Sequence, residues 1–112
     1  MALPHPLTDD AAELIAARFH LLAEPMRIKI LDRLRTGEAT VQELSVLLGT
    51  TSQNVSKHLG VLAREGVVGR RKRGNFSYYE VTDPGIYDIC ELVCGSVERR
   101  LGRLQEVLSG RL

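Results

Sequence analysis

Hydrophobic residues recur at steps of three and four along the first third of the chain, and this spacing predicts two amphipathic helices. The first begins after Thr8, whose hydroxyl can cap a helix. The second begins at Pro25, because proline is tolerated in a first turn, and ends at Gly37. Their apolar faces comprise Leu14, Ile15, Phe19 and Leu22 in the first helix and Ile28, Leu31 and Leu34 in the second.

Residues 40–65 show the same periodicity in two shorter helices. Thr40 and Glu43 have the spacing of a capping box, and Gly49 follows as a helix stop. Thr51 can cap the next helix, which closes at Gly66. The inward-facing residues of this second helix are predicted to be Val55, Leu59 and Leu62. Two short helices around a tight, glycine-containing turn are typical of a helix-turn-helix.

Two short strands are predicted next, at Val67–Val68 and Phe76–Val81. They are joined across Arg73, Gly74 and Asn75, where the Gly-Asn pair can supply the positive φ of a tight hairpin. This hairpin would form the wing of a winged helix-turn-helix.

Asp83 and Pro84 begin a final long helix. Its apolar stripe is longer than one neighbouring helix can cover, so part of it is interpreted as a dimer seam. The stripe comprises Ile86, Cys90, Val93, Val97, Leu101, Leu104 and Leu108. The elements predict a mainly α homodimer with a small β-hairpin. Each chain is a single winged helix-turn-helix domain over residues 1–112, with five helices and a two-stranded wing.

The distribution of charged residues along the chain indicates which class of partner the protein binds. The chain has 112 residues and a net charge of only +1, but residues 50–75 alone carry a balance of +5, which leaves −4 elsewhere. A basic segment on a mildly acidic body is expected of a focused contact with DNA. Enzymatic function has little support, because the chain offers no phosphate-binding glycine loop, no metal-hydrolase histidine pair and no nucleophile with its base.

The cellular compartment is predicted from the absence of a signal peptide, a membrane span and a disulfide framework in the sequence. Residues 1–6 have neither the basic nor the apolar region of a signal peptide. No apolar stretch is long enough to span a membrane. The two cysteines, Cys90 and Cys94, lie in one apolar segment and do not make a secreted disulfide framework. We therefore expect a cytoplasmic location and no membrane partner.

The second helix of the motif begins with short polar side chains, as a recognition helix does. Gln53 and Asn54 can make bidentate contacts to adenine, and Ser52, Ser56 and Lys57 can reach phosphates or bases. The simpler alternative is a capped, solvated helix start, which explains Thr51 in full and the other residues in part. The predicted DNA contacts of this helix are Thr51, Ser52, Gln53, Asn54, Ser56 and Lys57.

The hairpin favours the DNA interpretation over this alternative. Arg70, Arg71, Lys72 and Arg73 place four like charges together, which suits a surface that phosphates neutralise. We add Asn75 at the turn to the predicted DNA surface. The competing hypothesis is a winged-helix module that binds protein; it would lack salt-dependent binding to duplex DNA.

The chain resembles the ArsR/SmtB repressors over almost its whole length. The resemblance rests on residues 22–31 (LAEPMRIKIL), residues 55–59 (VSKHL) and residues 73–79 (RGNFSYY). It implies a homodimer formed through the first and last helices. It also implies binding to an inverted-repeat operator in duplex DNA, weakened by an inducer that is often a metal ion.

The sensor residues of that family do not carry over. Where one branch has a Cys-x-Cys pair, this chain has Thr40 and Gln42. Where another has an Asp, two His and a Glu on the last helix, Asp83 is followed by Gly85, Ser96 and Arg99. Both usual metal sites are therefore absent by this alignment.

Cys90 and Cys94 remain as candidate ligands for a soft or transition metal ion acting as inducer, or as sites of thiol oxidation. Their i, i+4 spacing places both sulfurs on one helix face, and a symmetric partner could double the ligand count. The alternative, which we favour, is that both are small hydrophobic residues in the dimer seam. In that case the protein is a repressor without this metal site.

Overall fold

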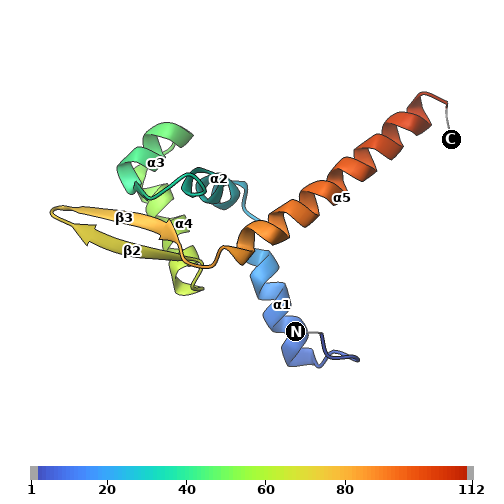
Figure 1. Ribbon diagram of the computed structural model, residues 1–112, viewed down its shortest axis with the longest axis horizontal. Helices are drawn as coiled ribbons and strands as arrows, with labels where there is room; N and C mark the ends of the chain where they lie inside the picture. The colour runs from blue at the N-terminus through green and yellow to red at the C-terminus, as the bar shows by residue number, and fades with distance from the viewer. Residues whose placement is uncertain (1–2, 111–112) are drawn as a thin grey trace. The chain divides into compact units, whose positions relative to one another are not determined.

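The computed structural model describes residues 3–110, so the ends of the predicted 1–112 domain, residues 1–2 and 111–112, lie outside the described residues. The contacts divide the chain into one compact unit up to Thr82 and a second from Asp83 onward. The elements of the first unit are α1 (Asp9–Leu21), α2 (Pro25–Leu34), β1 (Ala39–Thr40), α3 (Val41–Leu48), α4 (Ser52–Arg64), β2 (Val68–Arg73) and β3 (Phe76–Val81). The second unit contains α5 (Gly85–Leu108) (Figure 1).

The predicted starts of α1, α3 and α4 are confirmed by side-chain caps. Thr8 accepts a hydrogen bond from the backbone N–H of Ala11, 3.1 Å away. Both halves of the capping box between Thr40 and Glu43 are present at the start of α3. Gly49 ends α3 in the left-handed region with φ 64°, a conformation that glycine adopts without steric cost. All five helices begin within a few residues of the predicted positions, and α2, α3 and α4 end within a few residues of the predicted glycine stops.

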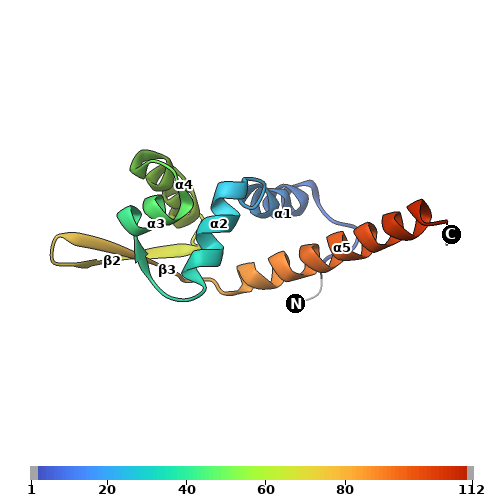
Figure 2. The ribbon, with the colours of Figure 1, turned by 90° about the horizontal axis from the view of Figure 1, so that it is seen from above.

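The sheet differs from the predicted two-stranded wing because it has three antiparallel strands in the order β1-β3-β2. Ala39 pairs with Tyr79 and Thr40 with Tyr78, so a strand of two residues extends the hairpin. A strand this short has no periodicity to reveal it in sequence. The hairpin itself projects beyond α3 and α4 in both views (Figure 1 and Figure 2).

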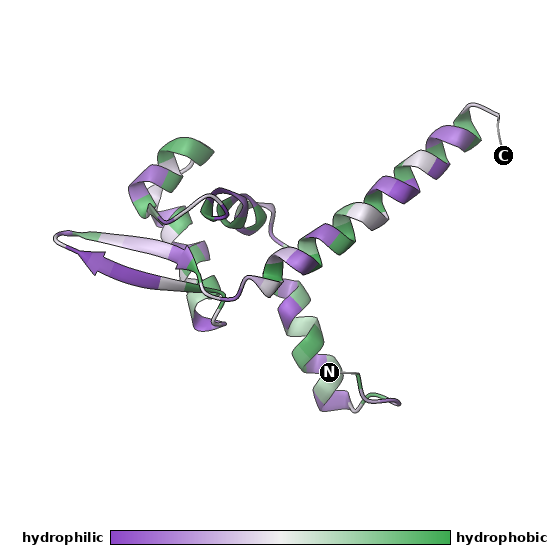
Figure 3. Cartoon of the chain, viewed as in Figure 1, coloured by the Kyte–Doolittle hydropathy of each residue, from purple (hydrophilic) through white to green (hydrophobic). Residues whose placement is uncertain are grey.

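β2 is also longer than predicted, because it continues from Val68 through Arg73 where only Val67–Val68 was expected. Pairing with β3 extends the strand through four charged residues that carry no hydrophobic alternation. At the turn, Gly74 has φ 62° whereas Asn75 keeps a negative φ, so the glycine alone supplies the positive φ. The polar character of β2 is visible in Figure 3.

A core of aliphatic side chains holds the helix-turn-helix together. Val55, Leu59 and Leu62 on α4 are fully buried, as predicted. Leu31 and Leu34 on α2 are buried too, but Ile28 is exposed, because α2 presents Arg27 and Ile30 to the interior instead. The remaining large, fully buried side chains of the first unit are Leu44 and Val67.

Large apolar side chains on α1 and α5 are exposed. On α1, Leu14 and Phe19 are exposed and Leu21 is the buried residue. On α5, Ile86 is buried, while most of the predicted stripe beyond it is at least half exposed. Figure 3 shows this apolar residue pattern recurring along α5. Within residues 3–110, no helix combines the length and the hydropathy needed to cross a bilayer.

Candidate nucleic-acid interface

The N-terminal half of α4 presents the polar surface that the sequence predicts. Ser52, Gln53, Ser56 and Lys57 are exposed, while Val55 points into the core. The buried residues Val55, His58, Leu59 and Leu62 occupy one face, so core packing directs the polar residues outward. The result is a helix face of short polar side chains and one cation.

Thr51 and Asn54 form hydrogen bonds that stabilise the start of α4. Thr51 Oγ1 accepts a hydrogen bond from the backbone N–H of Asn54, 3.1 Å away, and so caps α4. The half-buried Asn54 side chain donates from Nδ2 to Thr50 Oγ1, also at 3.1 Å. Asn54 therefore braces the turn before α4. Gln53 is the exposed amide of the predicted pair.

The four basic residues of the wing divide between the two faces of β2. Successive side chains of a strand point to opposite sides, so Arg71 and Arg73 share one face and Arg70 and Lys72 the other. Arg71 forms a 3.0 Å ion pair with Glu80, and the two residues lie diagonally across the hairpin. The run of four like charges seen in the sequence is therefore partly neutralised by carboxylates on this face of the strand.

Arg73 is held by two further groups. Its guanidinium forms an ion pair with Glu38 and lies over the ring of Tyr78, 4.2 Å from the ring centroid. Glu38 directly precedes β1, so this ion pair connects the tip of β2 to the start of β1. Arg70 and Lys72, by contrast, are exposed and have no carboxylate partner among the residues that the structure describes.

Sequence reasoning missed Glu38, Glu80 and Tyr78 as neighbours of the basic residues. Glu80 lies nine positions from Arg71, and the hairpin register alone brings the two together. Given the correct register, the diagonal pair could have been found from sequence. Glu38 could not, because its approach depends on β1.

A hollow lies between the wing tip and the starts of α3 and α4. It brings predicted contact residues from both elements together, since Ser52 and Asn75 both line it. The complete lining is Thr40, Val41, Gln42, Ser52, Asn75, Phe76 and Ser77. The hollow therefore joins residues of the hairpin to residues at the starts of α3 and α4.

His58 is buried on the side of α4 that faces away from this surface. Its Nδ1 lies 3.3 Å from Nη1 of Arg27, which is also buried. Burial lowers the pKa of His58, and the neighbouring cations Lys57 and Arg27 lower it further. This environment is that of a buried histidine that takes part in packing.

The cysteines do not make a metal site within one chain. Cys90 is half-buried and Cys94 is exposed, with its thiol 3.7 Å from Oε1 of Glu98. Among residues 3–110, no three His, Cys, Asp or Glu side chains are grouped so as to hold an ion. Two thiols fall short of the four ligands that a closed zinc site takes.

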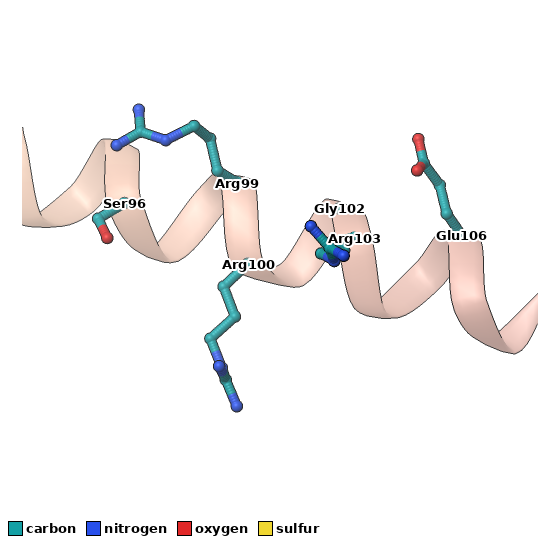
Figure 4. A pocket seen from close by; sticks show the side chains of 6 residues that line it. All are labelled: Ser96, Arg99, Arg100, Gly102, Arg103 and Glu106. Carbon is teal, nitrogen blue, oxygen red and sulfur yellow. The ribbon is translucent and has the colours of Figure 1, made fainter. Parts of the chain in front are cut away.

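The other positions on α5 fit a cation no better. Ser96 and Arg99, which the resemblance placed where other repressors carry metal ligands, line a hollow along the helix with Arg100 and Arg103. Figure 4 shows Arg99 and Arg100 projecting to opposite sides of the ribbon. Three guanidinium groups would repel a metal ion, so the donor set does not suit one.

Comparisons with known proteins agree with this geometry. A family model described as a helix-turn-helix domain matches residues 22–70. The uncharacterized HTH-type transcriptional regulator Rv0081 of Mycobacterium tuberculosis is 43% identical over 101 residues, which are 89% of this chain and 82% of that protein. In the Rv0081 crystal structure, 97% of the chain matches 86% of this one, with a TM-score of 0.77 and 35% identity.

Two further solved structures are similar. The AntR antimony-specific transcriptional repressor matches with a TM-score of 0.76 and 27% identity, over 88% of this chain and 90% of AntR. Mb0332 from Mycobacterium bovis is described as a homodimeric winged helix-turn-helix DNA-binding domain and a possible ArsR-family regulator. It matches with a TM-score of 0.72 and 26% identity, over 89% of this chain and 95% of its own. The chain belongs to the ArsR/SmtB family of winged helix-turn-helix transcriptional regulators, which bind DNA and are not enzymes.

Proposed function

We propose that this protein is a homodimeric repressor that binds an inverted-repeat operator and is released from it by an inducer. One observation carries the proposal: the exposed polar start of α4 and the unpaired cations of β2 belong to one compact unit. A duplex that touches both would be read by the helix and held by the hairpin.

In this proposal α4 enters the major groove. Gln53 reads a base edge, since its exposed amide can donate and accept at once and so match adenine. Ser52, Ser56 and Lys57 contact phosphates or base edges beside it. Thr51 and Asn54 keep the start of the helix in place through the hydrogen bonds described above.

The wing contributes affinity that does not depend on sequence. Arg70 and Lys72 are the cations free to neutralise phosphates, because no carboxylate competes for them among residues 3–110. Arg71 and Arg73 must first leave Glu80 and Glu38, so their net contribution is smaller. Asn75 at the hairpin tip, which lines the same hollow as Ser52, would add a further polar contact.

The dimer is supported by the apolar residues left exposed on α1 and α5. Leu14 and Phe19 on the first helix and Val97 and Leu101 on the last are each at least half exposed. Exposed apolar side chains of this size on a helix are typical of a partner interface. Mb0332, which has the same fold, is a homodimer. Two-fold symmetry would then place two copies of α4 in successive major grooves, roughly 34 Å apart.

The test combines sedimentation with DNA binding. We expect a stable dimer at micromolar concentration that binds an inverted-repeat duplex, with an affinity that falls steeply as salt rises. A stable monomer that binds one half-site tightly would contradict the dimer. Binding that ignores salt and duplex sequence would favour the protein-binding module instead.

The inducer part of the proposal involves Cys90 and Cys94. Cys94 is exposed and one helical turn from Cys90, and AntR is a repressor specific for antimony, an element that binds thiolates. Because one chain supplies only two thiols, the site would need a second copy of the chain.

Replacing both cysteines with Ala tests this part of the proposal. We expect the variant to bind DNA as the parent does but to lose release by thiophilic ions or oxidant; the matched serine variant controls for polarity. A variant that responds as the parent does would leave both cysteines as packing residues of the seam.

A further inference from the structure

A buried arginine connects three helices of the first unit at one point. Arg27 of α2 is 6% exposed. Its Nε donates to the carbonyl oxygen of Leu21 at 2.6 Å, and its Nη2 donates to that of His20 at 3.1 Å. These carbonyls belong to the last turn of α1, where the helix dipole favours a cation.

The third contact of the same guanidinium reaches the recognition helix. Nη1 lies 3.3 Å from Nδ1 of His58. A guanidinium can only donate, so Nδ1 must be an unprotonated acceptor and the ring must be neutral. His58 is 5% exposed and directly follows Lys57, which is on the DNA-facing side of α4.

No carboxylate balances this buried cation through a described ion pair. Arg27 is instead satisfied by two carbonyl oxygens and one imidazole nitrogen, so each acceptor matters to its burial. The charged groups acting on His58 are Arg27 and Glu24 from the α2 region and Lys57 from α4 itself. At the end of α1, the acceptors of Arg27 are backbone carbonyls.

We infer that Arg27 and His58 are positioning residues that couple the end of α1 to the recognition helix, and that protonating His58 weakens operator binding. A proton on Nδ1 removes the acceptor and places a second cation against a buried guanidinium. The two charges repel each other in a medium of low dielectric constant, so α4 moves away from its packed position against α2. This inference rests on the proposed DNA-binding function.

The lowered pKa of His58 supports this direction. Neutral His58 predominates at pH 7.5, and protonation sets in as the pH falls below 6.5, toward the lowered pKa. Added positive charge by itself would strengthen DNA binding, which is the opposite sign. A loss of affinity on acidification therefore separates the coupling from a general charge effect.

The experiment measures operator affinity at pH 7.5 and pH 5.5 for the parent and for His58→Asn. Asparagine can place an oxygen near Nδ1 and cannot titrate. We expect the parent to lose affinity by about threefold or more on acidification, because protonated His58 repels Arg27 across a buried contact. We expect His58→Asn to lose less than half as much. His20→Asn, which keeps its backbone carbonyl, is the matched control and should behave as the parent.

A shared pH profile in the parent and His58→Asn would overturn the coupling while leaving DNA binding intact. A parent that binds no duplex at pH 7.5 would contradict the proposed function instead. The coupling is then judged by amide hydrogen exchange, corrected for intrinsic rates, in α4 and the last turn of α1. Exchange should accelerate at pH 5.5 in the parent more than in His58→Asn, and equal acceleration would overturn the inference. His58→Gln serves as the second neutral variant if the asparagine form does not fold.

Discussion

Helix α4 and the wing, which are the two proposed DNA-contacting regions, hold their polar groups in place in two different ways. The polar face of α4 is fixed from behind by fully buried Val55, Leu59 and Leu62. The basic face of β2 is fixed from the side by exposed ion pairs, Arg71 with Glu80 and Arg73 with Glu38. Core packing is worth several kcal/mol, whereas exposed pairs are worth about 0–1 kcal/mol each. Core packing therefore fixes the position of the polar face of α4, whereas the ion pairs of the wing can break and release their cations at little cost in free energy.

The largest expected effect comes from removing the support behind α4. Leu59→Ala deletes a fully buried side chain and should lower the free energy of unfolding by about 2–5 kcal/mol through lost transfer energy and a cavity. Denaturant unfolding measures it. Leu47→Ala, at a leucine of α3 that is 60% exposed, is the matched control and should change stability by less than about 0.5 kcal/mol. Equal losses in the two variants would contradict the core described here.

Changing the face of α4 should alter sequence preference without altering stability. Gln53→Ala should reduce discrimination between operator and mismatched DNA by about 1–3 kcal/mol, the worth of a good bidentate contact. Asn54→Ala, one position along, should instead lower stability, because it removes the hydrogen bond to Thr50. Competition binding against single-base operator variants measures the first effect. If Asn54→Ala relaxed sequence preference more than Gln53→Ala, the assigned roles would be reversed.

Changing the pairing of the wing should alter affinity for any sequence. Glu80→Gln releases Arg71 and removes a negative charge from the DNA-facing side. We expect tighter binding to random duplex by up to about fivefold, the equivalent of about 1 kcal/mol for an exposed pair. Glu13→Gln on exposed α1 changes the net charge equally and should have a smaller effect. Identical gains in both variants would show that net charge, and not the pair, is responsible.

The smallest expected effect is on the pH dependence of stability. The pKa of His58 is lowered in the folded protein, so the unfolded chain binds more protons as the pH falls below 6.5. The stability contributed by neutral His58 is therefore present above pH 6.5 and lost as the pH falls through the lowered pKa. Thermal unfolding of the parent and His58→Asn between pH 7.5 and 5 should show a smaller decrease for the variant. If the stability of the two proteins fell equally with pH, His58 would not contribute to the pH dependence of stability.

Local signals predicted the helices well, because caps and stop residues act within a few positions, as at Thr8, Thr40 and Gly49. Contacts between distant positions were not accessible in the same way. The Arg27–His58 contact spans 31 positions, and the Arg73–Glu38 pair depends on a strand of two residues. The charge run of the wing was visible in sequence, but its division into paired and unpaired residues required the hairpin register.

The most direct test of the central claim is the salt dependence of duplex binding for two wing variants of equal charge. The dissociation constant is measured from 50 to 200 mM salt for the parent, for Arg70→Ala with Lys72→Ala, and for Arg71→Ala with Arg73→Ala. Each lost phosphate contact should reduce the slope of log K against log salt by about 0.9. We predict a reduction of nearly two such contacts in the first variant and a clearly smaller one in the second. An unchanged slope in the first variant would contradict the account, because the unpaired face of β2 would then not touch DNA.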